Sequence, residues 1–249
     1  MDDAAFIVEL LAGIFFTIAA VPLLRLAART RQYPERMLGI TFLLFGISYL
    51  FYEAPYLIQR EELFAPLSFG GRLLWNASVL TTALFTREVF HRERRWSRPL
   101  LWGITALLLV GIAISIQQGD LEGMAPNGNP GFWLEWIGQV IPFLWVVSAA
   151  LTEYASARRR VRIGLANPLV CNRYLLFACF GFAQLATIAL LVPMFDSVET
   201  NDGAIPHLLD QLMGAFEMLT LAIIWLAFFP PRCYREWIAL AAARSAAAR

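Results

Sequence analysis

An apolar segment near the end of the chain, residues 205–229, carries three ionisable side chains that could do chemistry, namely His207, Asp210 and Glu217. The segment is about long enough to cross a bilayer as one helix. On such a helix these three residues and Gly214 share one stripe, because they stand at positions i, i+3, i+10 and i+7. A carboxylate near mid-membrane costs roughly 2.5–3.5 kcal/mol on insertion scales, so Glu217 must face protein or water rather than lipid. The stripe therefore predicts one wall of a polar cavity.

Polar side chains recur toward the same end, or near the middle, of other apolar segments. These are Glu9, Glu53, Arg72, Asn76, Glu135, Gln139 and Gln184, which make ten candidate ligand-binding residues with His207, Asp210 and Glu217. Charges at such depth normally turn inward and pair. Arg72 is the only arginine among the ten and the only buried base expected on this side, so we expect it to share one site with Glu217 and to pair with Glu53, Asp210 or Glu217. Because the acids outnumber this base, either some carry a proton or a cation joins them.

Other interpretations of these ten residues have to be considered. The polar groups could simply hydrogen-bond one helix to another, which contributes about 0.5–2 kcal/mol for each bond. His207 and Asp210 have the spacing of a metal-ligand pair on a helix, but the chain has only one other histidine, His91. We therefore predict no metal or other cofactor, and interpret His207 as a solvated cap or a titrating partner of Asp210.

The composition identifies an integral membrane protein. Of its 249 residues 59% are hydrophobic and 16% charged, and the apolar residues come in long runs. Seven runs are long enough to span a bilayer: 4–28, 37–57, 69–90, 100–117, 132–153, 169–194 and 205–229. We therefore predict an all-α integral membrane protein that forms a single domain, 1–249, of seven transmembrane helices.

The arginines give the orientation of these helices. All 20 basic residues are arginine, and they cluster in the first, third and fifth connections and in the tail, whereas acids predominate in the other connections. By the positive-inside rule the N-terminus lies outside and the C-terminus inside. The arginine-only, alanine-rich composition is typical of a bacterial protein, so we predict the bacterial inner membrane. The three cysteines fall in the inner half of the membrane or on the inner side, and no external disulfide is expected.

The sequence contains a candidate internal repeat. The segment from Phe6 to Gly13 aligns with that from Phe132 to Gln139, and each contains a glutamate at the fourth position. This predicts repeats 4–98 and 132–238 around a linker helix, 100–117, in a 3+1+3 arrangement of the parallel type. After Pro230 and Pro231 the tail, 232–249, could form a short amphipathic helix on the cytoplasmic side or fray.

The predicted cytoplasmic face is the other candidate surface. Residues 87–98 and 158–162 are rich in arginine and could bind anionic lipid or an acidic protein partner, although topology alone also requires positive loops. The sequence has no glycine-rich phosphate loop, Ser-His-Asp set or HExxH motif. We therefore predict that the protein is not an enzyme, an intramembrane hydrolase included, and does not bind nucleic acid.

The segments RRRVRIGLANPLVCNRYLLF and FFPPRCYREW resemble those of bacterial seven-helix membrane proteins. The architecture is similar to that of the broad transporter, opsin and G-protein-coupled receptor group. The resemblance implies a seven-helix fold and supplies no activity. A retinal-binding rhodopsin in its usual form is excluded, because the chain has no lysine for the Schiff base.

The sequence leaves three hypotheses about function. The first is a receptor-like sensor that binds a small polar or cationic ligand, or protons, in an outward-facing cavity and signals to a cytoplasmic partner. The second is a small-solute or proton-coupled transporter that uses the acids as carriers. The third is a structural subunit of a membrane complex.

Overall fold

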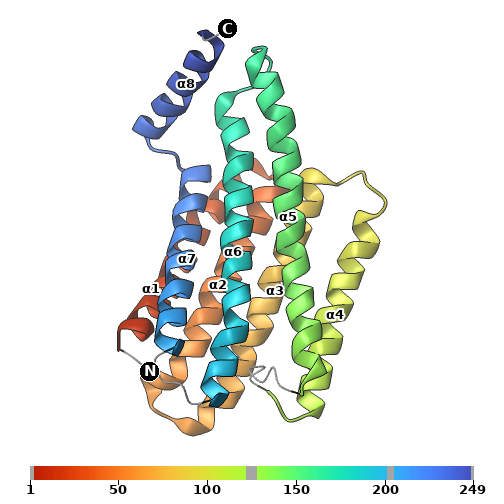
Figure 1. The fold of residues 1–249 in the computed structure, drawn as a ribbon, viewed down its shortest axis with the longest axis vertical. Helices are drawn as coiled ribbons and strands as arrows, with labels where there is room; N and C mark the ends of the chain where they lie inside the picture. Colours follow the sequence, from red (N-terminus) through yellow and green to blue (C-terminus); the bar gives the residue numbers. More distant parts are fainter. Residues whose placement is uncertain (1–2, 122–127, 201–204, 248–249) are drawn as a thin grey trace.

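The computed structural model describes residues 3–121, 128–200 and 205–247, with side chains described in these ranges except at 3–6, 8, 61, 195–200, 205–207, 210 and 242–247. Within these ranges the chain folds into long α-helices and one 3-10 helix, η1 (Figure 1). The helices are α1 (Asp3–Thr30), α2 (Tyr33–Ile58), η1 (Glu61–Leu63), α3 (Phe64–Phe90), α4 (Ser97–Gln117), α5 (Pro130–Arg162), α6 (Pro168–Thr200), α7 (Ile205–Phe228) and α8 (Arg232–Ala247). The all-α prediction is confirmed for the described residues.

Except for α7, the membrane-length helices extend past the apolar segments that predict them. The fifth segment, 132–153, lies within α5, which begins at Pro130 and continues to Arg162. Its start is fixed by Asn129, whose side-chain oxygen accepts a hydrogen bond of 3.2 Å from the backbone N–H of Phe132, and by Pro130, since proline fits the first turn of a helix. Hydropathy marks only the part of a helix that suits lipid, so it underestimates the length of such helices.

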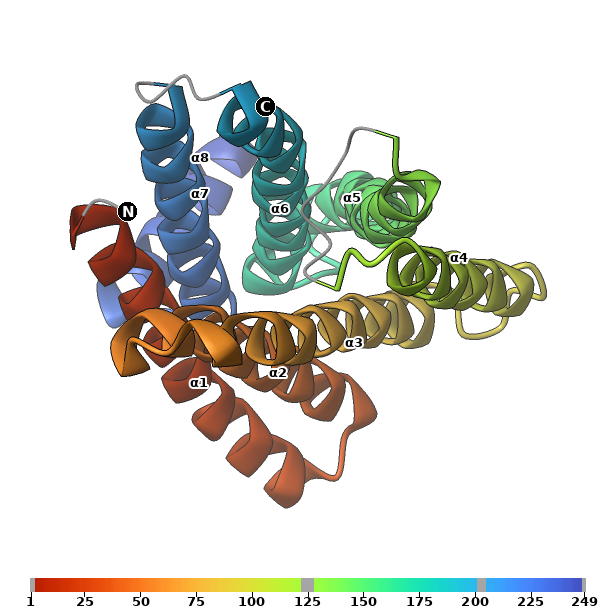
Figure 2. The ribbon, with the colours of Figure 1, turned by 90° about the horizontal axis from the view of Figure 1, so that it is seen from below.

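Six helices form a closed ring in the order α1, α2, α3, α5, α6 and α7, and α1 packs against α7 to close it (Figure 2). The remaining long helix, α4, lies outside this ring and packs mainly on α5. The first three helices and the last three are thus each consecutive neighbours. Helix α4, which contains the predicted linker segment 100–117, lies at the periphery.

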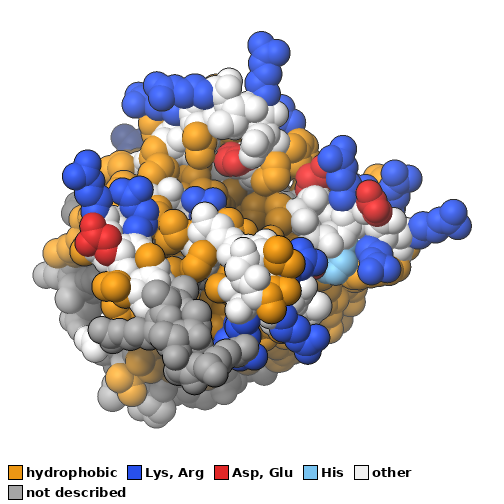
Figure 3. All heavy atoms as spheres, turned by 90° about the horizontal axis from the view of Figure 1, so that it is seen from above, with side chains coloured by type: hydrophobic (Ala, Val, Ile, Leu, Met, Phe, Trp, Pro, Cys, Tyr) orange, Lys and Arg blue, Asp and Glu red, His pale blue; other side chains and the backbone are white. Residues whose placement is uncertain are grey.

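The two ends of the bundle differ in charge. One end, here called the arginine-rich end, carries residues 25–36, 87–98, 158–162 and the start of α8, and lies at the top of Figure 1. Seen from above in Figure 3, arginine side chains project around much of its rim, with hydrophobic side chains toward its middle. The opposite end carries the start of α1 and the connections from α2 to α3 and from α4 to α5.

Six of the described helices, α1, α2, α4, α5, α6 and α7, are long and apolar enough to cross a membrane. They indicate a multi-pass membrane protein. Helix α3 is not among them, although it has 27 residues, because Arg72, Arg87 and Glu88 lower its hydropathy. It packs between α2 and α5 within the ring.

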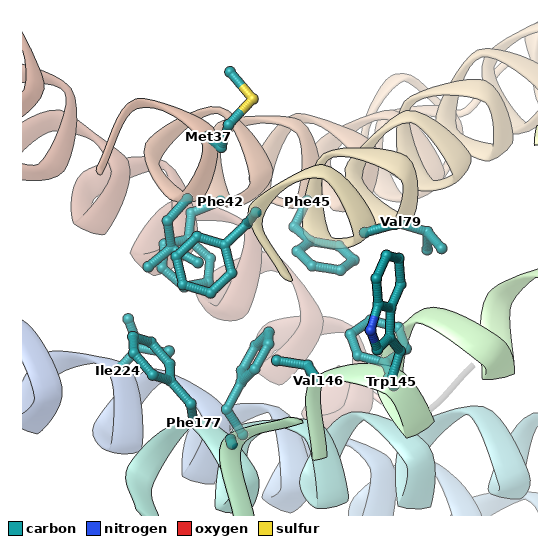
Figure 4. Packing of buried hydrophobic residues seen from close by; sticks show 14 of the residues in the cluster. Met37, Phe42, Phe45, Val79, Trp145, Val146, Phe177 and Ile224 are labelled. Carbon is teal, nitrogen blue, oxygen red and sulfur yellow. The ribbon is translucent and has the colours of Figure 1, made fainter. Parts of the chain in front are cut away.

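Aromatic residues fill the middle of the ring and its arginine-rich half (Figure 4). The ring of Phe180 on α6 lies 6.3 Å from that of Phe42 on α2 and 6.0 Å from that of Phe143 on α5. Nearer the arginine-rich end, the rings of Phe85 and Phe177 lie 5.3 Å apart. Phe42, Phe143 and Phe180 are at most 1% exposed. This apolar core confines the buried charges to the other half of the bundle and its middle.

Candidate functional site

The first polar group is built around an ion pair between Arg72 on α3 and Glu135 on α5. The Nε–H of Arg72 donates to both carboxylate oxygens of Glu135 at 3.0 Å, and its Nη2 donates to Oε2. The two residues are 3% and 4% exposed. Tyr52 on α2 lies close enough to both to interact electrostatically. A buried pair of this kind fixes α3 to α5, because neither charge is stable there without the other.

Neighbouring amides complete the hydrogen bonding of this pair. The Nδ2–H of Asn76 donates to Oε1 of Glu135, and Gln139 donates in turn to Oδ1 of Asn76 at 3.0 Å. On its other side, Nη1 of Arg72 donates to the backbone carbonyls of Asp120 and Leu121 at 3.0 and 3.2 Å. The guanidinium is therefore surrounded by acceptors, as a buried arginine requires.

Close packing of α4 on α5 brings those carbonyls to Arg72. A methyl group on Gly131 would lie 2.6 Å from the carbonyl oxygen of Gly111 and 2.7 Å from the hydroxyl of Ser115. Glycine at both crossing points lets the two backbones approach. Asn129 then donates to the Asp120 carboxylate at 2.7 Å and to the Ser115 hydroxyl at 3.3 Å. Asp120, Leu121 and Asn129, which are described parts of the connection between α4 and α5, are thus held close to the ion pair.

Among the described side chains the ion-pair partner of Arg72 is Glu135, so the expectation of a pair with Glu53 or Glu217 is wrong, while the side chain of Asp210 lies outside the described residues. The physical reason is the position of α5 in the ring. Helix α3 packs on α5, whereas α7 packs on α6 and α1. Glu135 consequently faces Arg72. Because the two side chains neutralise each other and use most of their hydrogen-bonding atoms on each other and on neighbouring groups, this group links α3 to α5 and has little capacity to bind a ligand.

The second polar group lies between α6 and α7, at the middle of both helices. Glu217 is 2% exposed, and its Oε2 receives no hydrogen bond from the described residues. Gln184 on α6 is also 2% exposed, and its Nε2 donates to the hydroxyl of Thr220 at 3.2 Å. Its Oε1 has no donor among the described residues either. Thr220 stands one turn after Glu217 on the same face of α7.

This second group is rich in acceptors and poor in donors. The hydroxyl of Thr220 donates to the backbone carbonyl of Phe216 at 2.9 Å, so its proton is already used within the helix. Glu9 on α1 is near enough to Glu217 for their charges to interact. Buried acceptors without donors are costly. The arrangement suits a species that brings positive charge or N–H and O–H donors.

The ten predicted residues are thus divided between places in the fold. Four of them, Arg72, Asn76, Glu135 and Gln139, form the first group, and Glu9, Gln184 and Glu217 belong to the second. Glu53 is buried on α2. His207 and Asp210 stand on α7, but their side chains lie outside the described residues. Among the side chains that are described, no group of three or more His, Cys, Asp and Glu is placed to hold a metal ion.

Sequence reasoning missed the residues that contribute by backbone or by short side chains. The carbonyls of Asp120 and Leu121 have no sequence signal, since every residue has one. Thr220 carries no charge and was not among the candidates. Asn129 could have been found, because asparagine followed by proline before an apolar run is a helix-start signal. Comparisons with known protein families, with curated proteins and with solved structures found no match to this chain.

Proposed function

We propose that this protein is a receptor-like, seven-helix membrane sensor that takes up a proton or a small cationic ligand beside Glu217 and signals at its arginine-rich end. The observation that carries the proposal is the buried Oε2 of Glu217, which has no hydrogen-bond donor among the described residues. A carboxylate in that environment is stable only when it is protonated or paired with a cation. Its state therefore depends on what the surrounding solution supplies.

The neighbours of Glu217 define the class of ligand. Gln184 presents its carbonyl oxygen, the Thr220 hydroxyl has one lone pair left as an acceptor, and Glu9 adds a second negative charge. All three favour a positively charged donor and disfavour an anion. A proton shared between acids, or a small cation such as ammonium, satisfies these groups, whereas an apolar molecule leaves them unpaired.

The fold offers a route from this site to the arginine-rich end. Helix α7 carries Glu217 and leads through Pro230 and Pro231 directly into α8. At the start of α8, the hydroxyl of Tyr234 accepts a hydrogen bond of 2.8 Å from Asn172 on α6. The two helices that hold the site are thus the two that hold α8. A ligand that changes their packing changes the position of α8 and of the adjacent Arg158–Arg162 surface, where we place the cytoplasmic protein partner, together with residues 87–98.

Sensing is favoured over transport by the aromatic core. In the middle of the ring, Phe180 contacts both Phe42 and Phe143, and all three side chains are fully buried. A transported ion would have to cross this apolar layer without polar groups to replace its water shell. The Arg72–Glu135 tie also holds α3 and α5 together, which opposes separation of the two halves of the ring.

The membrane arrangement belongs to the proposal. We place α3 as a seventh span, because it packs between α2 and α5 along the ring. Seven spans put the N-terminus outside and the arginine-rich end in the cytoplasm of a bacterial inner membrane, as the distribution of arginine requires. The 3+1+3 repeat is supported by the peripheral position of α4.

A binding experiment tests this proposal. The purified protein in lipid nanodiscs is titrated with protons and, separately, with ammonium and sodium chloride, and its unfolding temperature is recorded. Binding to the native state stabilises it, by about 2.7 kcal/mol at a ligand concentration of 100 Kd. We expect at least one probe to stabilise the wild-type protein and to lose this effect in Glu217→Gln, while Glu236→Gln, a change of an exposed acid on α8, behaves as wild type. An equal response in Glu217→Gln would contradict the proposal.

A second candidate function, transport of a small cation, is favoured by one observation. Two consecutive three-helix groups joined by a peripheral helix are the arrangement expected of a parallel-repeat transporter. Uptake of labelled ammonium analogues into proteoliposomes, dependent on Glu217, would support transport. Saturable binding without uptake would support the sensor.

A further inference from the structure

A separate pocket lies at the arginine-rich end, where the connection between α3 and α4 meets the side of α5. Its volume is about 210 Å³. The lining consists of Phe90, His91, Trp96, Trp145, Ser148, Ala149, Thr152 and Glu153. None of these belongs to either polar group described above. The volume is below the roughly 300–1,000 Å³ of sites for drug-sized molecules, so the pocket suits a smaller group.

A hydrogen-bonded turn builds the aromatic side of this pocket. The hydroxyl of Ser97, which is fully buried, donates to the carbonyls of His91 and Arg94 at 3.1 and 2.7 Å. The backbone N–H of Arg94 also donates to the carbonyl of His91, at 3.1 Å. This turn places the ring of Trp96 4.8 Å from that of His91 and 5.6 Å from that of Trp145.

The histidine in this cluster is held in its neutral form. The indole N–H of Trp145 donates to Nδ1 of His91 at 3.1 Å, which requires that nitrogen to be unprotonated. Burial, and then the positive charge of Arg94, lower the pKa of His91 below its usual range. The imidazole therefore adds an aromatic face to the pocket without adding positive charge.

The opposite wall supplies a carboxylate and two hydroxyls from α5. Glu153 is half-buried and, among the described residues, forms no ion pair. Ser148 and Thr152 donate their hydroxyl protons to backbone carbonyls of Trp145 and Ser148, at 3.0 and 2.7 Å, so their lone pairs remain as acceptors. Arg94 is exposed, and solvent screens its charge from the pocket more than that of Glu153.

We propose that this pocket binds an organic ammonium group, which lies against the rings of Trp96 and Trp145 and is neutralised by Glu153. A cation within about 6 Å of an indole ring is attracted by its electron-rich face, and tryptophan gives the strongest interaction of this kind. Aromatic rings with one carboxylate select an alkylated cation over a neutral isostere, because the isostere gains only the apolar contact. The ammonium can come from a lipid headgroup or from a soluble amine of the choline type.

The first experiment tests a soluble amine as the ligand. It measures the equilibrium binding of radiolabelled choline to the purified full-length protein in nanodiscs of phosphatidylglycerol. We expect saturable binding that 3,3-dimethylbutanol, the uncharged isostere of choline, does not displace. Trp96→Ala and Glu153→Gln are each expected to weaken binding about tenfold or more. Trp102→Ala is the matched control, since this tryptophan of α4 is 72% exposed and lies outside the pocket. Glu153→Gln keeps the shape of the side chain, so it tests the site even where Trp96→Ala impairs folding.

A second arm detects a lipid source. The protein is extracted from vesicles that contain equal amounts of phosphatidylcholine and phosphatidylglycerol, and the lipids that it retains are quantified. If the wild-type protein and Trp102→Ala retain phosphatidylcholine and Glu153→Gln retains less, the proposal is supported and the ligand is a lipid headgroup. If the protein binds choline but retains no phosphatidylcholine, the proposal is supported and the ligand is a soluble amine. Absence of both, or equal binding of choline by wild type and Glu153→Gln, overturns the proposal.

Discussion

Arg72 on α3 and Glu135 on α5 form a bidentate ion pair in which Nε of the arginine lies 3.0 Å from both carboxylate oxygens. Both side chains are buried inside the ring of helices. Removing one member leaves an uncompensated charge, whereas removing both leaves none. The stability of the bundle should therefore depend on the pair as a unit.

Arg72→Met is expected to lower the free energy of unfolding by about 3–5 kcal/mol, because it leaves the Glu135 carboxylate buried and unpaired. Glu135→Leu should cost a similar amount. The double variant should be more stable than the sum of the two single changes predicts, and a double-mutant cycle from denaturant unfolding measures this difference. Arg60→Ala is the control, because its ion pair with Glu62 is exposed and contributes about 0–1 kcal/mol. Strictly additive losses at Arg72 and Glu135 would show that the pair is not coupled.

Gly131→Ala is expected to destabilise the protein by about 1–3 kcal/mol through overpacking. The added methyl group would lie 2.6 Å from the carbonyl oxygen of Gly111, so α4 must move away from α5. This movement also withdraws the Asp120 carbonyl from Arg72. Gly103→Ala on α4 meets no atom within 4 Å, and should be neutral or slightly stabilising because alanine favours the helix. Thermal unfolding of the two variants compares them, and equal unfolding temperatures would refute the packing account.

Cys233 is expected to react with a membrane-impermeant maleimide only when the arginine-rich end is accessible. It is exposed at the start of α8, whereas Cys171 is buried and Cys179 half-buried. With seven spans, Cys233 should be labelled in inside-out vesicles and an N-terminal epitope detected in right-side-out vesicles. Cys233→Ser controls for the other thiols. Detection of both ends from the same side would mean that α3 does not cross the membrane.

His91 is expected to make the protein less stable as the pH falls. Burial, with a smaller contribution from Arg94, lowers the pKa of His91 in the folded protein, while the unfolded chain has a histidine pKa of about 6.5. Below about pH 6.5 the unfolded state therefore binds a proton before the folded state does, and stability is lost. Between about pH 7 and pH 5, His91→Gln should lose less stability than wild type in thermal unfolding. A steeper loss in the variant would reverse the sign that we assign.

The all-α, multi-pass character of the chain was predictable from the sequence, because long apolar runs separated by arginine-rich or acidic connections reflect the hydrocarbon of a membrane and the water on each side of it. The buried positions of Arg72, Glu135 and Glu217 followed from the same reasoning, since charges in apolar segments must turn inward. The ends of α5 and α6 could not be predicted from hydropathy, because these helices continue beyond their apolar segments into polar sequence.

The pairing of the charges could not be predicted, because it depends on which helices are neighbours. Sequence order places α4 beside α3, but α4 lies outside the ring, so α5 takes the position next to α3 and presents Glu135 to Arg72. The pocket at His91 and Glu153 was also missed. Its residues are separated by up to 63 positions in the chain, and its shape depends on a turn held by the hydroxyl of Ser97.

The most direct test of the account is whether the state of Glu217 is read at the arginine-rich end. An environment-sensitive fluorophore on Cys233 would be followed in right-side-out vesicles while the external solution is changed, first from about pH 8 to about pH 5 and then, at constant pH, by addition of ammonium chloride. We predict that at least one of these changes shifts the fluorescence of the wild-type protein and that Glu217→Gln abolishes the shift. A shift that persists unchanged in Glu217→Gln, or no shift with either probe in the wild type, would contradict the account.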